Sequence, residues 1–331
     1  MNKFKHFIGI DISKEYFDAT ILGESKQSSH NQFSNTKKGI TQFLKWVRQE
    51  KCSMDVTLIC MEYTGIYNKI ILDILINKSF YVWVEMSYRI IRSSGIQRGK
   101  NDKIDSERIA LYAKKNQEDA KIFKASDKVL DKIQGLLGQR EMILSHKTAL
   151  QVRTNELKVY DIEVYNVLSK NIKAIIRSEE VALKAIENQI DDLIKENQEL
   201  QVLYNHITSV PGVGRVTALF LICFTNACTT YENPRQLASY CGVVPFEYTS
   251  GKSVRGRAKV HFMANKKLKK LLHLCALSSS KNDIEMKQYY DKKVAEGKSK
   301  MLVLNNVRNK LIHRICACVK NNRPYEIRLI A

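Results

Sequence analysis

The first 85 residues alternate short apolar runs with amphipathic segments of helical period. Residues 38–49, for example, place Ile40, Phe43 and Val47 on one face of a helix. Residues 55–61 (DVTLICM) are mostly apolar and have the length of a fully buried strand. By these criteria we predict helices at residues 38–49 and 67–78, and strands at residues 4–12, 16–22, 28–34, 55–61 and 80–85.

The order of these elements is strand, strand, strand, helix, strand, helix, strand. This order predicts a mixed sheet with helices covering its faces, an α/β domain of the ribonuclease H type. A further helix, from Asp102 to Lys114, belongs to the same domain.

The pattern changes between about residues 127 and 207, where proline is absent and the apolar period is that of long helices. Positions separated by alternating steps of three and four residues form the a/d seam of a coiled coil. These positions are Leu183, Ile186, Ile190, Leu193, Asn197, Leu200, Tyr204 and Ile207. Asn197 falls on an a position, where a buried asparagine fixes register and strand number. We therefore predict a specific helix pair, and favour dimerisation between protomers over an internal antiparallel hairpin.

A helix-hairpin-helix signature follows at residues 209–217 (SVPGVGRVT). Gly212 and Gly214 allow the turn to expose backbone amides at the start of the next helix. Such amides favour docking of a nucleic-acid phosphate without base contacts, although ordinary turns also use Pro-Gly-x-Gly. Beyond the signature we predict an apolar helix, a loop at residues 242–259 and further helices at about 264–280 and 299–320.

The length of 331 residues is enough for two or more domains. The patterns divide the chain into a mixed α/β domain, a helical coiled-coil domain and a mainly α-helical domain. The boundaries that we predict are 1–125, 126–205 and 206–331.

The charge of the chain indicates a polyanionic partner. Fifty-four Lys and Arg residues oppose 34 Asp and Glu residues, which gives a net charge of +20. Residues 206–331 contain 22 of the basic and 7 of the acidic side chains, so that most of the excess lies in the C-terminal third. Such a basic region is typical of nucleic-acid binding.

The eight cysteines indicate a reducing compartment. Most lie in apolar runs, without a Cys-x-x-Cys pair or histidine at zinc-site spacing, so we interpret them as reduced core residues. Asp11 interrupts the apolar start where a signal peptide needs an unbroken run, and no run approaches the 18 apolar residues of a membrane span. We therefore expect a cytoplasmic protein with no membrane contact.

Four carboxylates are placed where the predicted sheet brings them together. Asp11 lies inside the first apolar strand, where an unpaired charge calls for a cation, and Glu62 directly follows the buried strand 55–61. Asp102 and Asp105 lie three residues apart at the start of a helix and point the same way. Four such groups predict a site for two divalent ions, Mg²⁺ or Mn²⁺, that serves phosphoryl transfer. The alternative for the helix pair is interaction with the helix dipole, and for Glu62 a helix cap.

A second candidate site is the loop at residues 242–259, which contains Ser250-Gly-Lys-Ser253. A serine beside a glycine is conformationally free, and nearby cations neutralise a phosphate under attack. These cations are Lys252, Arg255, Arg257 and Lys259. The same loop also fits a generic phosphate-binding role. Just downstream, Lys266, Lys267, Lys269 and Lys270 crowd the first turns of a helix, where the dipole prefers acids, so a bound polyanion is expected there.

The combination of the acidic tetrad, the Pro-Gly-Val-Gly hairpin and the Tyr-Thr-Ser-Gly-Lys-Ser-Val-Arg-Gly loop resembles the DEDD transposases of bacterial insertion sequences, the bridge-RNA-guided recombinases. The resemblance covers nearly the whole chain and implies an RNase H-like (RuvC-like) N-terminal domain, a coiled-coil middle and a C-terminal transposase domain. It implies that Asp11, Glu62, Asp102 and Asp105 bind magnesium. It also implies that Ser250 is the nucleophile, with Ser253 as the fallback.

The implied reaction is attack of the serine on a DNA phosphodiester, giving a phosphoserine link and a free 3′-hydroxyl that later reseals to another strand. The implied partners are double-stranded donor and target DNA, a guide (bridge) RNA and further copies of the chain, in a dimer or tetramer. Base pairing then reads sequence while basic side chains read backbone.

Other functions remain open from the sequence. One is a Holliday-junction-type, metal-dependent endonuclease in which water attacks and Ser250 only binds phosphate. Another is a nucleic-acid scaffold without catalysis, for which the basic C-terminal region suffices. An actin-like sugar kinase shares the Gly-Ile-Asp opening but has a glycine-rich phosphate turn where this chain has Ser13-Lys14.

Overall fold

The computed structural model describes residues 3–23, 28–93, 95, 101–123, 127–251 and 253–326, with the backbone alone for Ser250 and Val254. The chain forms two compact units, residues 1–125 and 126–331. Each is described by itself below.

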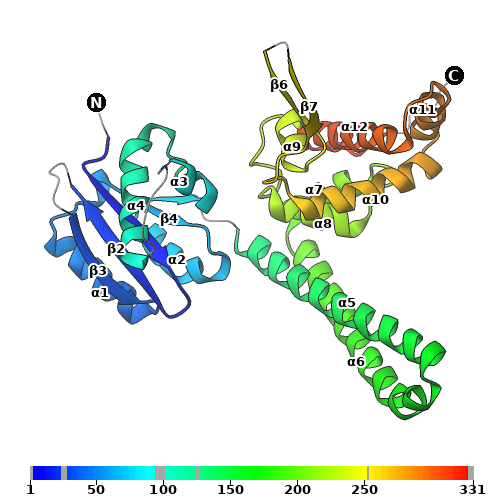
Figure 1. The fold of residues 1–331 in the computed structure, drawn as a ribbon, viewed down its shortest axis with the longest axis horizontal. Coiled ribbons are helices and arrows are strands. Elements are labelled where there is room, and N and C mark those ends of the chain that lie inside the picture. Colours follow the sequence, from blue (N-terminus) through cyan, green and yellow to red (C-terminus); the bar gives the residue numbers. More distant parts are fainter. Residues whose placement is uncertain are drawn as a thin grey trace. The chain divides into compact units, whose positions relative to one another are not determined.

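The first unit is a mixed α/β domain, as predicted (Figure 1). Its elements are β1 (His6–Ile12), β2 (Tyr16–Leu22), β3 (Ser28–Ser34), α1 (Lys37–Gln49), β4 (Thr57–Glu62), α2 (Lys69–Asn77), β5 (Tyr81–Glu85), α3 (Ser87–Ser93) and α4 (Asp102–Lys115). Short 3-10 helices occur at Met54–Val56, Gly65–Asn68 and Gln117–Asp119. The predicted strands and helices are all present, and only α3 was not expected.

The five strands form one sheet in the order β3-β2-β1-β4-β5. β1 pairs antiparallel with β2 and parallel with β4, so that the first three strands form a meander and β4 and β5 extend the sheet in parallel. This arrangement is consistent with a ribonuclease H-like domain, as expected from the order of elements.

The two faces of the sheet carry separate cores because side chains alternate along each strand. Ile8 and Ile10 face α1 and α2, where they pack with residues such as Phe43. Phe7 faces the opposite side and packs in the same cluster as Ile109 of α4. Gly9 and Asp11 belong to this second face, which is therefore the face that α4 covers.

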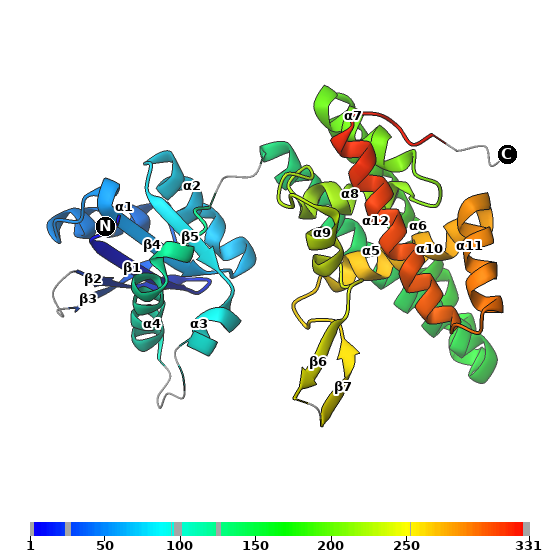
Figure 2. The same cartoon turned by 90° about the horizontal axis from the view of Figure 1, so that it is seen from above.

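The second unit is mainly helical (Figure 2). Its elements are α5 (Lys128–Tyr160), α6 (Ile162–Lys195), α7 (Gln198–Thr208), α8 (Arg215–Phe224), α9 (Pro234–Tyr240), β6 (Phe246–Ser250), β7 (Val254–Lys259), α10 (Lys266–Asn282), α11 (Ile284–Ala295) and α12 (Lys300–Lys320). One hydrophobic core joins α7 to α12 with the start of α5 and the end of α6. β6 and β7 form a two-stranded hairpin that leaves the bundle (Figures 1 and 2). The boundary that we expect at residue 205 stays a prediction.

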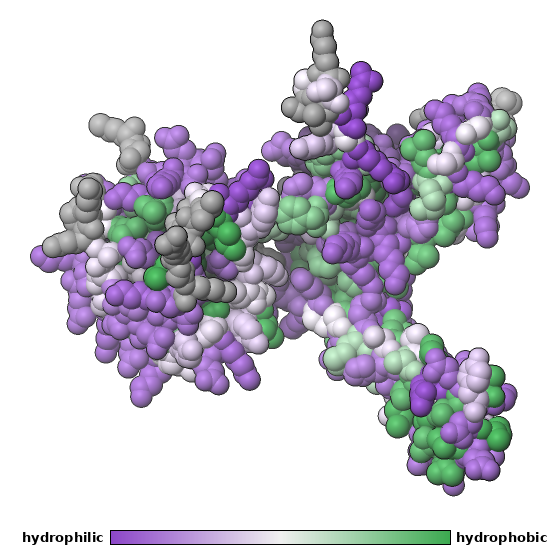
Figure 3. All heavy atoms as spheres, viewed as in Figure 1, coloured by the Kyte–Doolittle hydropathy of each residue, from purple (hydrophilic) through white to green (hydrophobic). Residues whose placement is uncertain are grey.

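The long helical region forms an internal antiparallel hairpin of α5 and α6, which was the alternative to pairing between protomers. Arg140 of α5 binds Glu187 of α6 at 2.8 Å, and Lys147 binds Glu180 at 2.6 Å. Apolar side chains gather on its distal part, where Val159 and Val167 are 72% and 74% exposed (Figure 3).

The expected continuous seam through Asn197 is wrong. α6 ends at Lys195, and Asn197 is the N-cap of α7, where its side-chain oxygen accepts a hydrogen bond from the Leu200 amide at 3.1 Å. The reason is that asparagine competes with the helical backbone for hydrogen bonds and favours helix starts. The spacing of apolar residues continues from α6 into α7, so it gives no sign that one helix ends and another begins.

Among the residues that the structure describes, no helix is both long and apolar enough to span a membrane.

Candidate metal centre and nucleic-acid interface

Direct contact between α4 and β1 determines the geometry of the acidic site. A Cβ atom on Gly9 would lie only 2.1 Å from the Ser106 carbonyl oxygen and 2.2 Å from the Ala110 nitrogen. The helix backbone therefore rests on the strand, and a buried hydrogen bond of 2.7 Å between Thr20 and Ser106 holds it there. Since the Ser106–Ala110 turn lies over Gly9, the first turn of α4 lies near Asp11.

The four predicted carboxylates meet on this face. Asp11 is partly buried in β1, and Glu62 ends β4, the parallel neighbour of β1. Burial raises the pKa of Asp11 to about 6, and the negative charges of Glu62, Asp102 and Asp105 contribute to the increase. Glu62, Asp102 and Asp105 therefore each lie close enough to Asp11 for their charges to act on it.

Two of the carboxylates already have protein partners. Ser87 donates a hydrogen bond to Glu62 Oε2 at 2.6 Å, and Arg108 binds Asp105 Oδ1 at 2.7 Å. Asp102 is exposed at the first position of α4, whose N-cap is Asn101. A cavity of about 150 Å³ opens beside these groups, with Glu62, Asp105 and Arg108 in its wall.

The carboxylates fit a divalent cation by their chemistry. They are hard oxygen donors of the kind that Mg²⁺ and Mn²⁺ prefer, and a cation would offset the repulsion at Asp11. No three Asp, Glu, His or Cys side chains of the described residues form a closed coordination cluster. Ion binding therefore requires small side-chain movements, such as exchange of the Ser87 and Arg108 contacts for the ion.

Two further acids on the same face were missed from the sequence. Asp18 lies opposite Asp11 in the strand register and is 3% exposed, with hydrogen bonds from His30 at 2.8 Å and Gln32 at 2.9 Å. Glu85 pairs with Glu62 in the register and accepts a hydrogen bond from the Met86 amide at 2.8 Å. Glu85 ends a buried strand just as Glu62 does, and this signal was available in the sequence.

The candidate serine loop is the tip of the β6–β7 hairpin. Ser250 is the last residue of β6 and pairs with Val254, while the Ser250 side chain and the whole of Lys252 lie outside the described residues. Ser253 is exposed. On β7 the predicted phosphate contacts Arg255, Arg257 and Lys259 are all exposed. A register shift opposite Phe246 and Tyr248 interrupts the alternation of side chains along this strand.

The lysines at the start of α10 differ in their surroundings. Lys266 and Lys270 are exposed, whereas Lys269 is partly buried along Gly242. The Lys267 amine forms a salt bridge with Glu141 of α5 and lies 4.9 Å from the centre of the Phe220 ring. Lys267 thus has a structural role between helices, and we expect Lys266 and Lys270 to make the phosphate contacts instead.

The two glycines of the helix-hairpin-helix signature have different environments. Gly212 has φ +87°, and a Cβ atom there would lie 2.7 Å from the Cβ of Ser279. The close packing against α10 is therefore sufficient by itself to require glycine at this position. Gly214 is exposed and is the N-cap of α8, with no side-chain cap bond. The amides of the first turn of α8 therefore remain the candidate phosphate contact, while Arg215 binds Asp191 at 2.9 Å.

Comparison with known proteins matches both units to one family. Residues 8–157 match the DEDD model described as "Transposase", and residues 204–291 match "Transposase IS116/IS110/IS902 family". The chain is a DNA transposase of the IS110 family. The "Pilin gene-inverting protein" of Moraxella lacunata is 26% identical to this transposase over 98% of the chain and 99% of the relative, and that of Moraxella bovis gives the same values. The "Insertion element IS110 uncharacterized 43.6 kDa protein" of Streptomyces coelicolor is 31% identical over 45% of the chain and 35% of the relative.

The family match bears on the acidic site of this transposase. The DEDD domain that the first match covers suggests dependence on a divalent metal, in agreement with the chemistry of the four carboxylates. The individual ligands, the identity of the metal and the role of Ser250 remain predictions.

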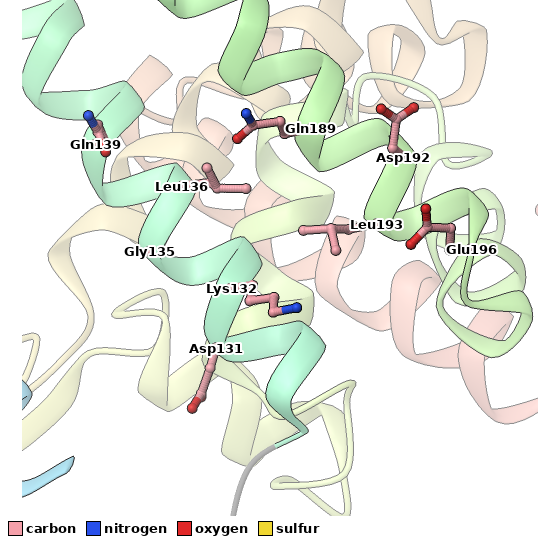
Figure 4. Close-up of a pocket in the computed structure, with 9 residues that line it drawn as sticks. All are labelled: Asp131, Lys132, Gly135, Leu136, Gln139, Gln189, Asp192, Leu193 and Glu196. Carbon is pink, nitrogen blue, oxygen red and sulfur yellow. The ribbon is translucent and has the colours of Figure 1, made fainter. Parts of the chain in front are cut away.

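A cavity of about 540 Å³ in the second unit of the transposase is unrelated to the predicted site residues. It lies between α5 and α6 at the base of their hairpin, and Figure 4 shows Asp131, Asp192 and Glu196 in its wall. Its apolar floor includes Leu136 and Leu193. Because the acidic residues outnumber Lys132, the cavity is unsuited to a phosphate backbone.

Proposed function

We propose that this transposase cuts and rejoins DNA with Ser250 as the nucleophile and with Asp11, Glu62, Asp102 and Asp105 as ligands of Mg²⁺ or Mn²⁺. The observation that carries the proposal is the position of these four acids on the α4 face. There the negative charges of Glu62, Asp102 and Asp105 add to the effect of burial and raise the pKa of Asp11. A bound divalent ion supplies charge neutralisation at the phosphate that reacts. The family match to DEDD transposases supports this assignment.

In the proposed reaction the Ser250 hydroxyl attacks phosphorus. The Oγ–P bond forms, the bond from phosphorus to the 3′-oxygen breaks, and the serine proton passes to the leaving oxygen. The products are a phosphoserine and a free 3′-hydroxyl, and the reverse step on another strand reseals the DNA. The exposed cations Arg255 and Arg257 on β7 are positioned on the chain to neutralise phosphate near the serine.

The proposed nucleic-acid partners are donor and target DNA and a guide RNA. Two relatives that align over nearly the whole chain are named for pilin gene inversion, which supports recombination between two DNA sites. The concentration of basic residues after residue 206 supports binding of more nucleic acid than one scissile strand. Sequencing of RNA that co-purifies with the protein tests the guide, and a heterogeneous cellular mixture would argue against it.

We also propose a homo-oligomer, dimer or tetramer. The exposed apolar residues on the distal part of the α5–α6 hairpin, including Val159 and Val167, support self-association. Sedimentation of the purified protein measures this directly.

The decisive experiment uses labelled DNA and a denaturing gel. Wild type is expected to leave a protein–DNA adduct in the presence of Mg²⁺, whereas Ser250→Ala leaves none. Ser253→Ala is the matched control at the same hairpin tip and is expected to retain the adduct. Cleavage by Ser250→Ala without an adduct would instead show that water is the nucleophile, as in a junction-type endonuclease. Activity that survives Asp11→Ala would remove the metal centre from the mechanism.

A further inference from the structure

Arg308 is a buried cation for which the described residues supply no counter-charge. It lies on α12 and is 6% exposed, with a core that includes Leu304 and Leu311 on the same helix. Its Nε atom is buried without a hydrogen-bond partner. Among the described residues, the side chain forms neither an ion pair nor a hydrogen bond. Burial lowers the pKa of the guanidinium, but an arginine side chain stays charged in a protein at neutral pH. A buried charge in this state is costly unless an anion joins it.

Arg314, the next arginine on α12, shows how a buried arginine is usually neutralised by acidic partners. Arg314 is also largely buried, and it binds Asp283 and Glu285, each at 2.5 Å. The region from residue 206 onward has only seven acidic residues, and three of them already pair with Arg314 or Lys293. Three of these seven acids therefore pair with other cations, and Arg308 has no acidic partner among the described residues.

The surroundings of Arg308 are basic. His273 of α10 is close enough for the positive charge of Arg308 to help lower its pKa, after the larger effect of burial. The Nδ1 atom of His273 is itself buried without a partner among the residues that the structure describes. Lys269 lies one helical turn before His273 on the same side of α10. We call these three residues the Arg308 cluster.

The cluster lies near the base of the β6–β7 hairpin. Asn305, one turn before Arg308, donates a hydrogen bond of 2.8 Å to the Val243 carbonyl, three residues before β6 begins. The stem of Lys269 lies beside Gly242, where an added Cβ atom would be 3.3 Å from Lys269 Cδ. The residues that lead into the hairpin therefore contact α10 and α12. The hairpin leaves the bundle from this side (Figures 1 and 2).

We infer that Arg308, with His273 and Lys269, forms a phosphate-binding site that receives a backbone phosphate of the nucleic acid bound at the β6–β7 hairpin. A guanidinium is suited to this role because its planar donors match two phosphate oxygens. The Arg308 Nε–H group is a donor that the described residues leave unused, and His273 Nδ1 can donate a second hydrogen bond when it carries the ring proton. The phosphate class follows from the cluster alone, and only its carrier, a nucleic acid, rests on the proposed function.

The test is thermal unfolding of the full chain at constant ionic strength, with chloride replaced by inorganic phosphate. Wild type is expected to gain about 2–4 °C in Tm. Arg308→Met is expected to have a Tm equal to or above that of wild type in chloride, because the buried charge is gone, and to lose the gain in phosphate. Arg314→Met is the matched control on the same helix: it should lower Tm by breaking two ion pairs and keep the phosphate gain.

A second variant and a second measurement make the outcome independent of folding effects. His273→Gln removes no hydrogen bond of the described residues and should reduce the phosphate gain by at least half. Binding of a catalytically inert DNA duplex by Arg308→Met should show a slope of log K against log salt that is smaller by about 1. An unchanged slope with a lost phosphate gain would mean that free phosphate, not nucleic acid, is the ligand.

The inference is overturned if Arg308→Met keeps the phosphate gain, or if it lowers Tm in chloride as Arg314→Met does. Neither measurement involves strand cleavage, so failure of the Ser250 mechanism would leave the result interpretable.

Discussion

At the scale of single residues, a comparison of Asp11 with Asp18 distinguishes a proposed metal ligand from an acid with a structural role. They face each other in the β1–β2 register, but only Asp18 has hydrogen bonds from neighbouring side chains among the described residues. In a chelating buffer, Asp11→Asn is expected to stabilise the protein by about 1 kcal/mol because it removes charge repulsion. Asp18→Asn is expected to destabilise it by about 1–3 kcal/mol, since an amide has one acceptor oxygen where the carboxylate accepts two hydrogen bonds.

Thermal unfolding with and without Mg²⁺ measures both effects. Wild type and any folded Asp18→Asn protein should gain stability from the ion, and Asp11→Asn should gain much less. An equal gain in all three proteins would show that the ion binds elsewhere.

Gly9 is expected to be highly sensitive to substitution. Gly9→Ala places a methyl group within 2.2 Å of two backbone atoms of α4, so the helix must move away from the strand. We expect a loss of at least about 3 kcal/mol in the free energy of unfolding and loss of the stabilisation by Mg²⁺, because Asp102 and Asp105 move with α4. Gly23→Ala is the control, since an added Cβ there meets only a side-chain atom at 4.0 Å. Chemical denaturation of both variants provides the comparison, and similar stabilities would contradict the close packing of α4 on β1.

The role of an acidic residue could be predicted from the sequence only where it depends on the residue's own strand and not on partners in other elements. Asp11 stands out in the sequence because it interrupts an apolar strand, and Glu62 because it ends one. Asp18 also lies in an apolar run, but its partners His30 and Gln32 are on the next strand and become visible only with the register. The pairing of Lys267 with Glu141, 126 residues away, could not be deduced from local spacing.

At the scale of elements, hydrophobic period was a reliable guide where an element packs on one face. The strands of the sheet and the helices α1, α2 and α4 follow their predicted ranges closely. α3 was not predicted because its seven residues bury only Ile90, which leaves no periodic signal. Between α6 and α7 the period continued through a helix break, and the capping preference of Asn197 was the contrary signal.

The Asn197 assignment gives a prediction of opposite sign from the coiled-coil interpretation. At a buried a position, Asn197→Leu would stabilise the helix pair. As an N-cap residue, Asn197→Leu removes the hydrogen bond to the Leu200 amide and should cost about 1 kcal/mol. Asn197→Asp retains an acceptor oxygen at the cap and should be close to wild type. Urea unfolding distinguishes the two interpretations, and a stabilised Asn197→Leu protein would restore the seam.

At the scale of the whole molecule, charge and chemistry are divided between the two units. The acidic tetrad belongs to the first unit, and the basic hairpin and lysine-rich helix α10 belong to the second. The sequence predicted this division because it depends on composition and on motifs, which are local. How much of the basic surface binds nucleic acid depends on which cations already have protein partners, and that requires the structure.

Lys270 and Lys267 provide the test of this last point. Both were expected to bind phosphate, but Lys270 is exposed while Lys267 pairs with Glu141 and lies over Phe220. Lys270→Gln should weaken binding to unrelated duplexes by a similar factor, lower the slope of log K against log salt by about 1 and leave stability within about 0.5 kcal/mol of wild type. Lys267→Gln should leave the slope nearly unchanged and destabilise the fold by about 1 kcal/mol, because Glu141 loses its partner. Fluorescence anisotropy over a salt series, together with thermal unfolding, measures both quantities. A lower slope for Lys267→Gln than for Lys270→Gln would mean that DNA displaces Glu141 and that the salt bridge opens on binding.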